Sequence, residues 1–262
     1  MADHGVLAGF EETRFTYAGA ARTVFRAGAG PGVVVIHELP GLTPSVAGFA
    51  RKVVEAGFTV AAPVLAGTPG RPMSVPYVMR EMTRVCVSKE FTTWATNRTS
   101  PVVEWLRALA RDLHATAGGP GVGAIGMCFS GGFALAMAVD DVLLAPVCSQ
   151  PSLPFAAGKR RARDLGLSPA DAARIRDRDD LCVLAMRFTA DRAVPAARFE
   201  ALRELLGDRL IAVEIDSGKG NAHGIGRMAH SVVTEHLVDQ PGHPTRDALD
   251  RVLAFFRERL TA

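Results

Sequence analysis

The sequence is poor in several residue types. It has only four lysines, so nearly all of its 30 basic side chains are arginines, and it has two tryptophans and two tyrosines. The 27 acidic side chains leave a formal net charge of +3, which is too small to argue for nucleic acid or an anionic membrane as a partner. Because arginine is abundant throughout, a single arginine is weak evidence for an anion site. With 48% hydrophobic residues, the composition excludes a disordered chain.

Cysteine is also scarce. The four cysteines form no CxxC pair, and the opening ten residues are too short and too polar for a secretory signal, so we expect a cytoplasmic protein. Residues 115–139 carry no charge over a length that could cross a bilayer. They include many glycines and a proline, which favours a buried strand, a turn and a buried helix over a membrane span.

Runs with strand character alternate with amphipathic helical stretches along most of the chain. The predicted strands are 14–17, 23–26, 32–36, 58–64, 122–127, 142–147, 181–188 and 210–215. This alternation predicts one α/β domain over residues 1–262, with a mostly parallel central sheet and helices on both faces. Residues 73–99 give no clear pattern, and no structure is predicted for them.

The most informative segment is Gly126-Met127-Cys128-Phe129-Ser130-Gly131-Gly132, where a predicted strand meets a predicted helix. A nucleophile at such a turn needs small neighbours, and the helix N-terminus stabilises a thiolate. The backbone N–H of Phe129 can then donate to a developing oxyanion. Two other readings stay open: Cys128 as a small core residue, and Ser130 as the nucleophile of a degraded GxSxG motif.

A thiol nucleophile needs a base, and the base needs an orienting carboxylate. In this fold class the acid and then the histidine follow the nucleophile, each in a loop after a later strand. Asp191 fits the acid, although it could serve only as a helix cap. His223, in a glycine-rich loop after the last predicted strand, fits the base. His230 is the nearest alternative, but we expect it in a helical stretch.

Together, the cysteine segment, Asp191 with Val194-Pro195, and His223 resemble the Cys-Asp-His triad of the dienelactone hydrolase family, a branch of the α/β-hydrolases. Residues 36–42 (IHELPGL) are similar to the motif that follows the third strand in that family. The resemblance extends from about residue 33 to the final helix and implies the α/β-hydrolase fold. Ser130 departs from the usual glycine, and residues 88–100 have no clear counterpart.

The resemblance also implies roles for residues outside the triad. Glu38 would pair with the resting thiol and take its proton when substrate binding swings the cysteine toward the histidine. The backbone N–H of Leu39 would join that of Phe129 in an oxyanion hole. This device has a physical purpose, because an ordinary thiol with a pKa of about 8.5 is only a few per cent thiolate at neutral pH.

The resemblance further implies that arginines bind the substrate. Arg227 stands four residues after His223, at a family position whose arginine holds a substrate carboxylate. A second arginine would come from the segment before the cysteine turn, with Arg84 and Arg80 as candidates. Arginine suits a bidentate grip on a carboxylate.

The sequence therefore predicts a hydrolase of a small ester or lactone that works through an acyl-cysteine intermediate. It is expected to need no cofactor or metal, to bind neither nucleic acid nor a membrane, and to be a monomer or homodimer. One alternative is a non-catalytic scaffold that binds small molecules or proteins, and another is a serine esterase using Ser130. A thiol redox role is disfavoured because no resolving cysteine lies nearby in the sequence, and no paired histidines have metal-ligand spacing.

Overall fold

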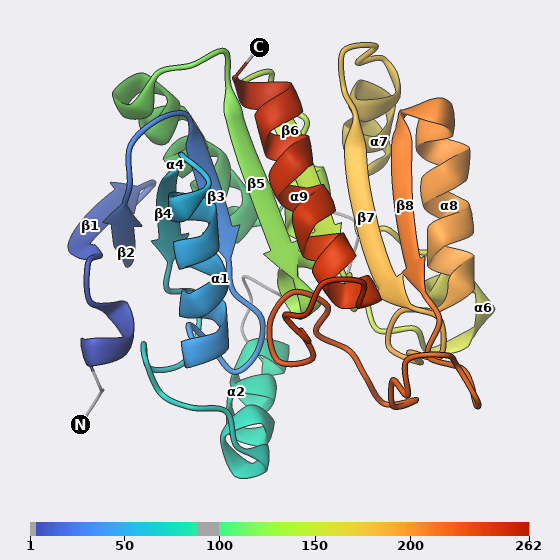
Figure 1. Ribbon diagram of the computed structural model, residues 1–262. Helices are drawn as coiled ribbons and strands as arrows, with labels where there is room; N and C mark the ends of the chain where they lie inside the picture. Colours follow the sequence, from blue (N-terminus) through green and yellow to red (C-terminus); the bar gives the residue numbers. More distant parts are fainter. Residues whose placement is uncertain (1–3, 88–99, 262) are drawn as a thin grey trace.

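A central sheet organises the computed structural model, which describes residues 4–87 and 100–261. Eight strands within these residues lie in the order β1-β2-β4-β3-β5-β6-β7-β8 (Figure 1). The strands are β1 (Glu11–Tyr17), β2 (Ala20–Ala27), β3 (Gly32–Ile36), β4 (Thr59–Pro63), β5 (Val122–Met127), β6 (Leu143–Ser149), β7 (Val183–Phe188) and β8 (Leu210–Ile215). The β1–β2 hairpin is antiparallel and joins β4 in antiparallel fashion, and all other pairs are parallel. The predicted edge hairpin and mostly parallel sheet are confirmed.

Helices cover both faces of the sheet. The helices are α1 (Pro44–Glu55), α2 (Val75–Val87), α4 (Pro101–Ala117), α5 (Gly131–Met137), α6 (Gly158–Ala162), α7 (Pro169–Arg176), α8 (Ala196–Leu206) and α9 (Pro244–Leu260), with 3-10 turns η1 (His4–Leu7), η2 (Cys128–Ser130) and η3 (Gly207–Arg209). Helices α1 and α9 pack on one face, and α4, α5 and α8 pack on the other (Figure 1). Among the described residues, no helix combines the length and the apolar content that crossing a bilayer requires.

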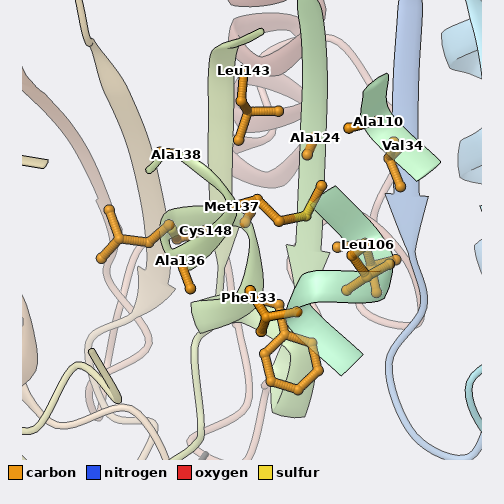
Figure 2. Packing of buried hydrophobic residues seen from close by; sticks show 14 of the residues in the cluster. Val34, Leu106, Ala110, Ala124, Phe133, Ala136, Met137, Ala138, Leu143 and Cys148 are labelled. Carbon is orange, nitrogen blue, oxygen red and sulfur yellow. The ribbon is translucent and has the colours of Figure 1, made fainter. Parts of the chain in front are cut away.

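Strand β3 shows why these sequences form a doubly covered sheet. All five of its residues are buried, as expected for a continuous apolar run. Val33 and Val35 point toward the α1 and α9 layer, while Val34 and Ile36 belong to the cluster on the other face. Figure 2 shows that second cluster, in which Val34 lies near Leu106 of α4. The strands are therefore fixed from both sides, and their carboxyl ends hold the loops between them rigidly.

Local signals in the sequence place several helix starts correctly. The Ser100 hydroxyl accepts a hydrogen bond from the Val102 N–H at the start of α4, with Pro101 in the first turn. Ser168 caps α7 in the same way. Helix α2 accounts for residues 75–87 of the stretch that has no clear pattern, and residues 88–99 lie outside the described residues.

Candidate active site

The turn between β5 and α5 holds Cys128 in a strained conformation. The backbone of Cys128 has a φ of 55°, which is uncommon for a residue with a side chain. A Cβ atom on Gly126 would lie 2.1 Å from the carbonyl oxygen of Ser130, and one on Gly131 would lie 2.6 Å from Cα of Pro151. Both positions therefore need glycine for the strand, the turn and the helix to meet, as a nucleophile turn requires.

Ser130 has a structural position instead of facing a substrate. Its side chain is fully buried, and its hydroxyl accepts a hydrogen bond from the Met127 N–H at 2.9 Å. The same hydroxyl lies 3.1 Å from the carbonyl oxygen of Ile36 and 3.0 Å from that of His37, to either of which it can donate. Ser130 thus ties the cysteine turn to the end of β3, and this geometry does not favour the serine nucleophile.

Cys128, His230 and Asp191 come together at the carboxyl ends of the strands. Asp191 follows β7, is buried, and its Oδ2 lies 2.6 Å from Nδ1 of His230. Its other oxygen accepts a hydrogen bond from the Ala193 N–H at 2.9 Å, which fixes the carboxylate. The His230 imidazole and the thiol of Cys128 line the same cavity, and the two groups interact electrostatically. Along the chain the three residues follow in the order Cys128, Asp191, His230, and the histidine bonded to the acid is His230 instead of His223.

The surroundings of His230 favour its protonated form. Burial alone would lower the pKa of this imidazole, but the negative charge of Cys128 and the hydrogen bond to Asp191 together raise the pKa of His230 to about 11. The imidazole is therefore a cation at neutral pH, and it faces a sulfur atom that can carry the matching negative charge. A thiolate–imidazolium pair is the arrangement that makes a cysteine nucleophilic without an external base.

The expected placement of His223 is corrected. His223 is exposed, its ring packs edge-on against His243 with centroids 5.4 Å apart, and it lines a second cavity instead of the one that contains Cys128. The expected helix around His230 is also wrong, since the chain between β8 and α9 forms turns. In this segment the Asn221 side chain donates to the carbonyls of Gly218 and Ile225. These two hydrogen bonds fix the turn that contains His223, and the chain continues from it to His230 at the sheet edge.

Glu38 is buried at the end of β3, but its contacts differ from the expected pairing with the thiol. Its carboxylate accepts hydrogen bonds from the hydroxyls of Ser231 (2.6 Å) and Thr234, and from the side-chain amide of Gln150 (3.2 Å). Burial raises the pKa of Glu38, although the two hydroxyl donors act against that shift. No hydrogen bond joins it to Cys128 in the described part of the chain. Glu38 therefore holds the loop that carries His230.

His236 fixes the same loop from the other side. Its Nδ1 accepts a hydrogen bond from the Ser231 N–H at 3.2 Å, and its ring packs against Phe188 with centroids 6.2 Å apart. Burial and the nearby positive charge of His230 lower the pKa of His236. This imidazole is thus neutral at pH 7, as an acceptor of a backbone N–H must be.

Two residues after β6 belong to the site and were missed in the sequence. The Ser152 hydroxyl lies 3.4 Å from Sγ of Cys128, and the Ser152 N–H donates to the Cys128 carbonyl at 3.0 Å. Gln150 has a φ of 35° and donates to Glu38. Their position directly after a parallel strand was the available signal, because ligands bind at the carboxyl edge of open α/β sheets.

A cavity of about 710 Å³ opens onto Cys128 between α2 and the loops that follow β3, β5, β6, β7 and β8. Leu39 and Phe129 line it, as their expected role requires. Arg227 and Arg84 do not: Arg227 is exposed elsewhere on the loop, and Arg84 pairs with Glu81 at 3.2 Å on the outer side of α2. Arg80 pairs with the same carboxylate. The expected arginine grip on a substrate is therefore absent from the described part of the cavity.

No cluster of three or more metal-binding side chains occurs in residues 4–87 and 100–261.

Comparisons with known proteins bear on both fold and family. A dienelactone hydrolase from Anabaena variabilis is 16% identical with a TM-score of 0.58, covering 96% of this chain and 99% of that one. A dienelactone hydrolase-like promiscuous phosphotriesterase from metagenomic libraries is 18% identical with a TM-score of 0.65, covering 96% and 98%. These likenesses show the α/β-hydrolase fold. A search of curated proteins finds no match. The sequence profile of the dienelactone hydrolase family matches residues 19–260, and the chain belongs to that family of hydrolases.

Proposed function

We propose that the protein hydrolyses a small carboxylic ester or lactone through an acyl-cysteine intermediate. Cys128 is the nucleophile, His230 exchanges protons with the reacting oxygens, and Asp191 orients His230. The observation that carries this proposal is that one imidazole is bonded to the buried Asp191 carboxylate, at 2.6 Å, and lines the same cavity as the Cys128 thiol. An acid–histidine–nucleophile chain of this kind at a strained turn has few uses other than acyl transfer.

In the first half of the reaction, the thiolate of Cys128 attacks the carbonyl carbon, and a C–S bond forms as the carbonyl oxygen takes the negative charge. Collapse of this intermediate breaks the C–O bond to the alcohol, whose oxygen takes the proton from the His230 imidazolium. In the second half, neutral His230 removes a proton from water, and the resulting hydroxide attacks the thioester. Loss of the acid restores the thiolate–imidazolium pair.

The oxyanion is stabilised by backbone donors. The N–H groups of Leu39 and Phe129 belong to residues that line the cavity beside the thiol, one after β3 and one after β5. Donors fixed on two adjacent rigid strands are already oriented before charge develops, which is the main source of such stabilisation.

Glu38 acts in this scheme as a positioning residue. Its hydrogen bonds in the described part of the chain go to Gln150, Ser231 and Thr234, and none goes to the thiol whose proton it would take. The Glu38 carboxylate instead accepts two hydroxyl hydrogen bonds from Ser231 and Thr234, on the loop that begins with His230. Charge-assisted hydrogen bonds to a buried carboxylate are strong enough to hold a loop without regular structure in one conformation.

The test of the proposal is hydrolysis of p-nitrophenyl butyrate by Cys128→Ala and Cys128→Ser variants. We expect Cys128→Ala to lose activity by at least ~10³-fold, as removal of a nucleophile does. Cys148→Ala is the matched control, because Cys148 is buried in the core and burial raises its pKa to about 12. Mass spectrometry of the acylated protein should place the adduct on Cys128. Full activity of Cys128→Ala would refute the mechanism.

The alternative of a non-catalytic scaffold makes the opposite prediction. A scaffold would be inert toward a panel of esters and lactones, and its Cys128 would be alkylated no faster than Cys148. The strained backbone at Cys128 argues against this alternative, since a scaffold has no need to maintain a φ of 55° at a cysteine.

A further inference from the structure

Two of the described walls of the cavity at Cys128 are apolar. Helix α2 contributes one wall, and the loop after β6 contributes another. The side chains are Met73, Val78, Met82, Val85, Leu153 and Phe155. Met73 and Phe155 are 38% and 51% exposed, so the apolar surface continues from the thiol out to the mouth of the cavity. An apolar chain attached to the reacting carbonyl would be removed from water along this path.

Positive charge is scarce on the described walls of this cavity. None of its lining residues among those described is an arginine or a lysine. His236 is neutral at pH 7, because burial and the charge of His230 lower its pKa. The remaining cation, His230, is already engaged by Asp191 and Cys128. An anionic substrate group would therefore have no partner along the described walls.

The arginines of α2 do not change this picture. Arg80 and Arg84 both pair with the buried carboxylate of Glu81, whereas Val78, Met82 and Val85 face the cavity. The helix thus presents its apolar stripe to the cavity and its guanidinium groups elsewhere.

The position four residues after the histidine also lacks a cation. Arg227 holds that position relative to His223, but relative to His230 it is Thr234. The Thr234 side chain is buried, and its hydroxyl donates to Glu38. This hydroxyl is satisfied within the protein and cannot serve as a grip on a carboxylate.

The mouth of the cavity carries a negative charge. Glu235 lines the cavity and is exposed, with one long contact of 3.5 Å from the Thr43 hydroxyl to its Oε1. Its charge reaches deep enough to raise the pKa of Glu38. A substrate carboxylate entering here would lose its hydration without gaining a partner and would meet a like charge, and both effects weaken binding.

We propose that the acyl group of the substrate is neutral and apolar, and that Glu235 selects against acyl groups that end in a carboxylate. This inference rests on the proposed ester hydrolysis and narrows it. It reverses the expectation of an arginine-bound acid, because the residues that would hold the acid lie outside the described cavity walls.

The experiment compares two esters that differ at one end. p-Nitrophenyl hexanoate ends its chain in a methyl group, and mono-p-nitrophenyl adipate has a carboxylate in the same place. After subtraction of the spontaneous rate, we expect kcat/KM for the hexanoate to exceed that for the adipate by at least ~100-fold, the cost of leaving one charge unpaired in an apolar site. Glu235→Gln should raise kcat/KM for the adipate relative to the hexanoate about threefold to tenfold. This is the effect expected from removing one exposed charge that repels the adipate carboxylate.

Two arginine substitutions on the same helix test whether the preference between the two esters depends on charge in the cavity wall. Met82→Arg adds a cation to the cavity wall and should shift the preference toward the adipate, while Met79→Arg adds the same cation to the same helix outside the lining. An equal or faster rate on the adipate in the unmodified protein would overturn the inference while leaving ester hydrolysis intact. Failure to hydrolyse either ester, with no acyl adduct on Cys128, would overturn both proposals.

Discussion

The segment between β8 and α9 lies against two cavities, each with a histidine from that segment. The first cavity contains Cys128 and is lined by His230 and His236; the second, of about 540 Å³, is lined by His223 together with residues of β8 and α9. Both cavities have carboxylates nearby, Asp191 in the first and Asp216 in the second. The two cavities differ in whether neighbouring residues fix the orientation of the imidazole.

His230 is fixed by contacts that act on its ring and on its backbone. Its ring is bonded to Asp191, and the loop that follows is held by Glu38 and His236. His223 is exposed, its backbone donates a hydrogen bond to Asn221, and its ring packs on His243 with no bond to a carboxylate among the described residues. Proximity to an acid in the sequence is therefore insufficient: a general base needs an orienting partner and a reacting atom within reach.

The largest expected effect distinguishes His230 from His223 as the general base. His230→Ala should lower kcat/KM for p-nitrophenyl hexanoate by about 10³-fold or more, because it removes the group that both donates and accepts the transferred proton. His223→Ala is the matched control and should stay within about twofold. A larger loss in His223→Ala than in His230→Ala would show that His223, in the second cavity, is the general base.

The second effect concerns how the thiolate is maintained. Because the pKa of His230 is raised to about 11, we expect its imidazolium to persist from pH 6 to pH 9 and to favour ionisation of the neighbouring thiol over this range. Alkylation of Cys128 by iodoacetamide should therefore be nearly independent of pH over this range.

In His230→Ala the same reaction should follow an ordinary thiol with a pKa of about 8.5, falling about 100-fold at pH 6 and recovering near pH 9. Cys148 provides the internal reference, since burial raises its pKa to about 12 and it should stay unmodified in the folded protein. A steep pH dependence in the unmodified protein would contradict the ion pair.

The smallest effect concerns the loop that carries His230. Glu38→Gln should lower kcat about tenfold and the free energy of unfolding by about 1–3 kcal/mol, because the hydroxyls of Ser231 and Thr234 lose a charged acceptor. Ser231→Ala should give a similar loss, and the double variant should lose less than the sum, since both changes break one network.

The alkylation profile then separates positioning from proton transfer. If Glu38 only positions the loop, Glu38→Gln keeps the flat profile of the unmodified protein. A profile in Glu38→Gln that rises steeply with pH would show instead that Glu38 controls ionisation of the thiol.

The fold could be predicted because its signals are local. The apolar run of β3, the serine caps and the glycines around Cys128 each specify backbone conformation within a few residues. The positions of Cys128 and Asp191 follow from the same signals, since Cys128 comes directly after β5 and Asp191 lies in the turn after β7. The expected cytoplasmic location, the monomer or homodimer and the single domain stay predictions.

The histidine could not be predicted because its place depends on distant contacts. The loop after β8 is irregular, and its path is set by Asn221 within the loop and by Glu38, which comes nearly two hundred residues earlier. The expectation for Arg227 depended on that histidine, because Arg227 was chosen by its distance from His223 in the sequence. Charge and spacing in the sequence do not report which side of α2 faces the cavity.

The negative mouth of the cavity has a consequence for turnover. Hydrolysis converts an uncharged acyl group into a carboxylic acid, which ionises at neutral pH. In the proposed reaction the product carboxylate forms in the cavity that Cys128 and Glu235 line, and the described apolar walls offer its new charge no partner. The proposed reaction thereby converts an ester that fits the cavity into an acid that fits it poorly. Glu235, which does not oppose binding of the uncharged ester, favours release of the charged product into water.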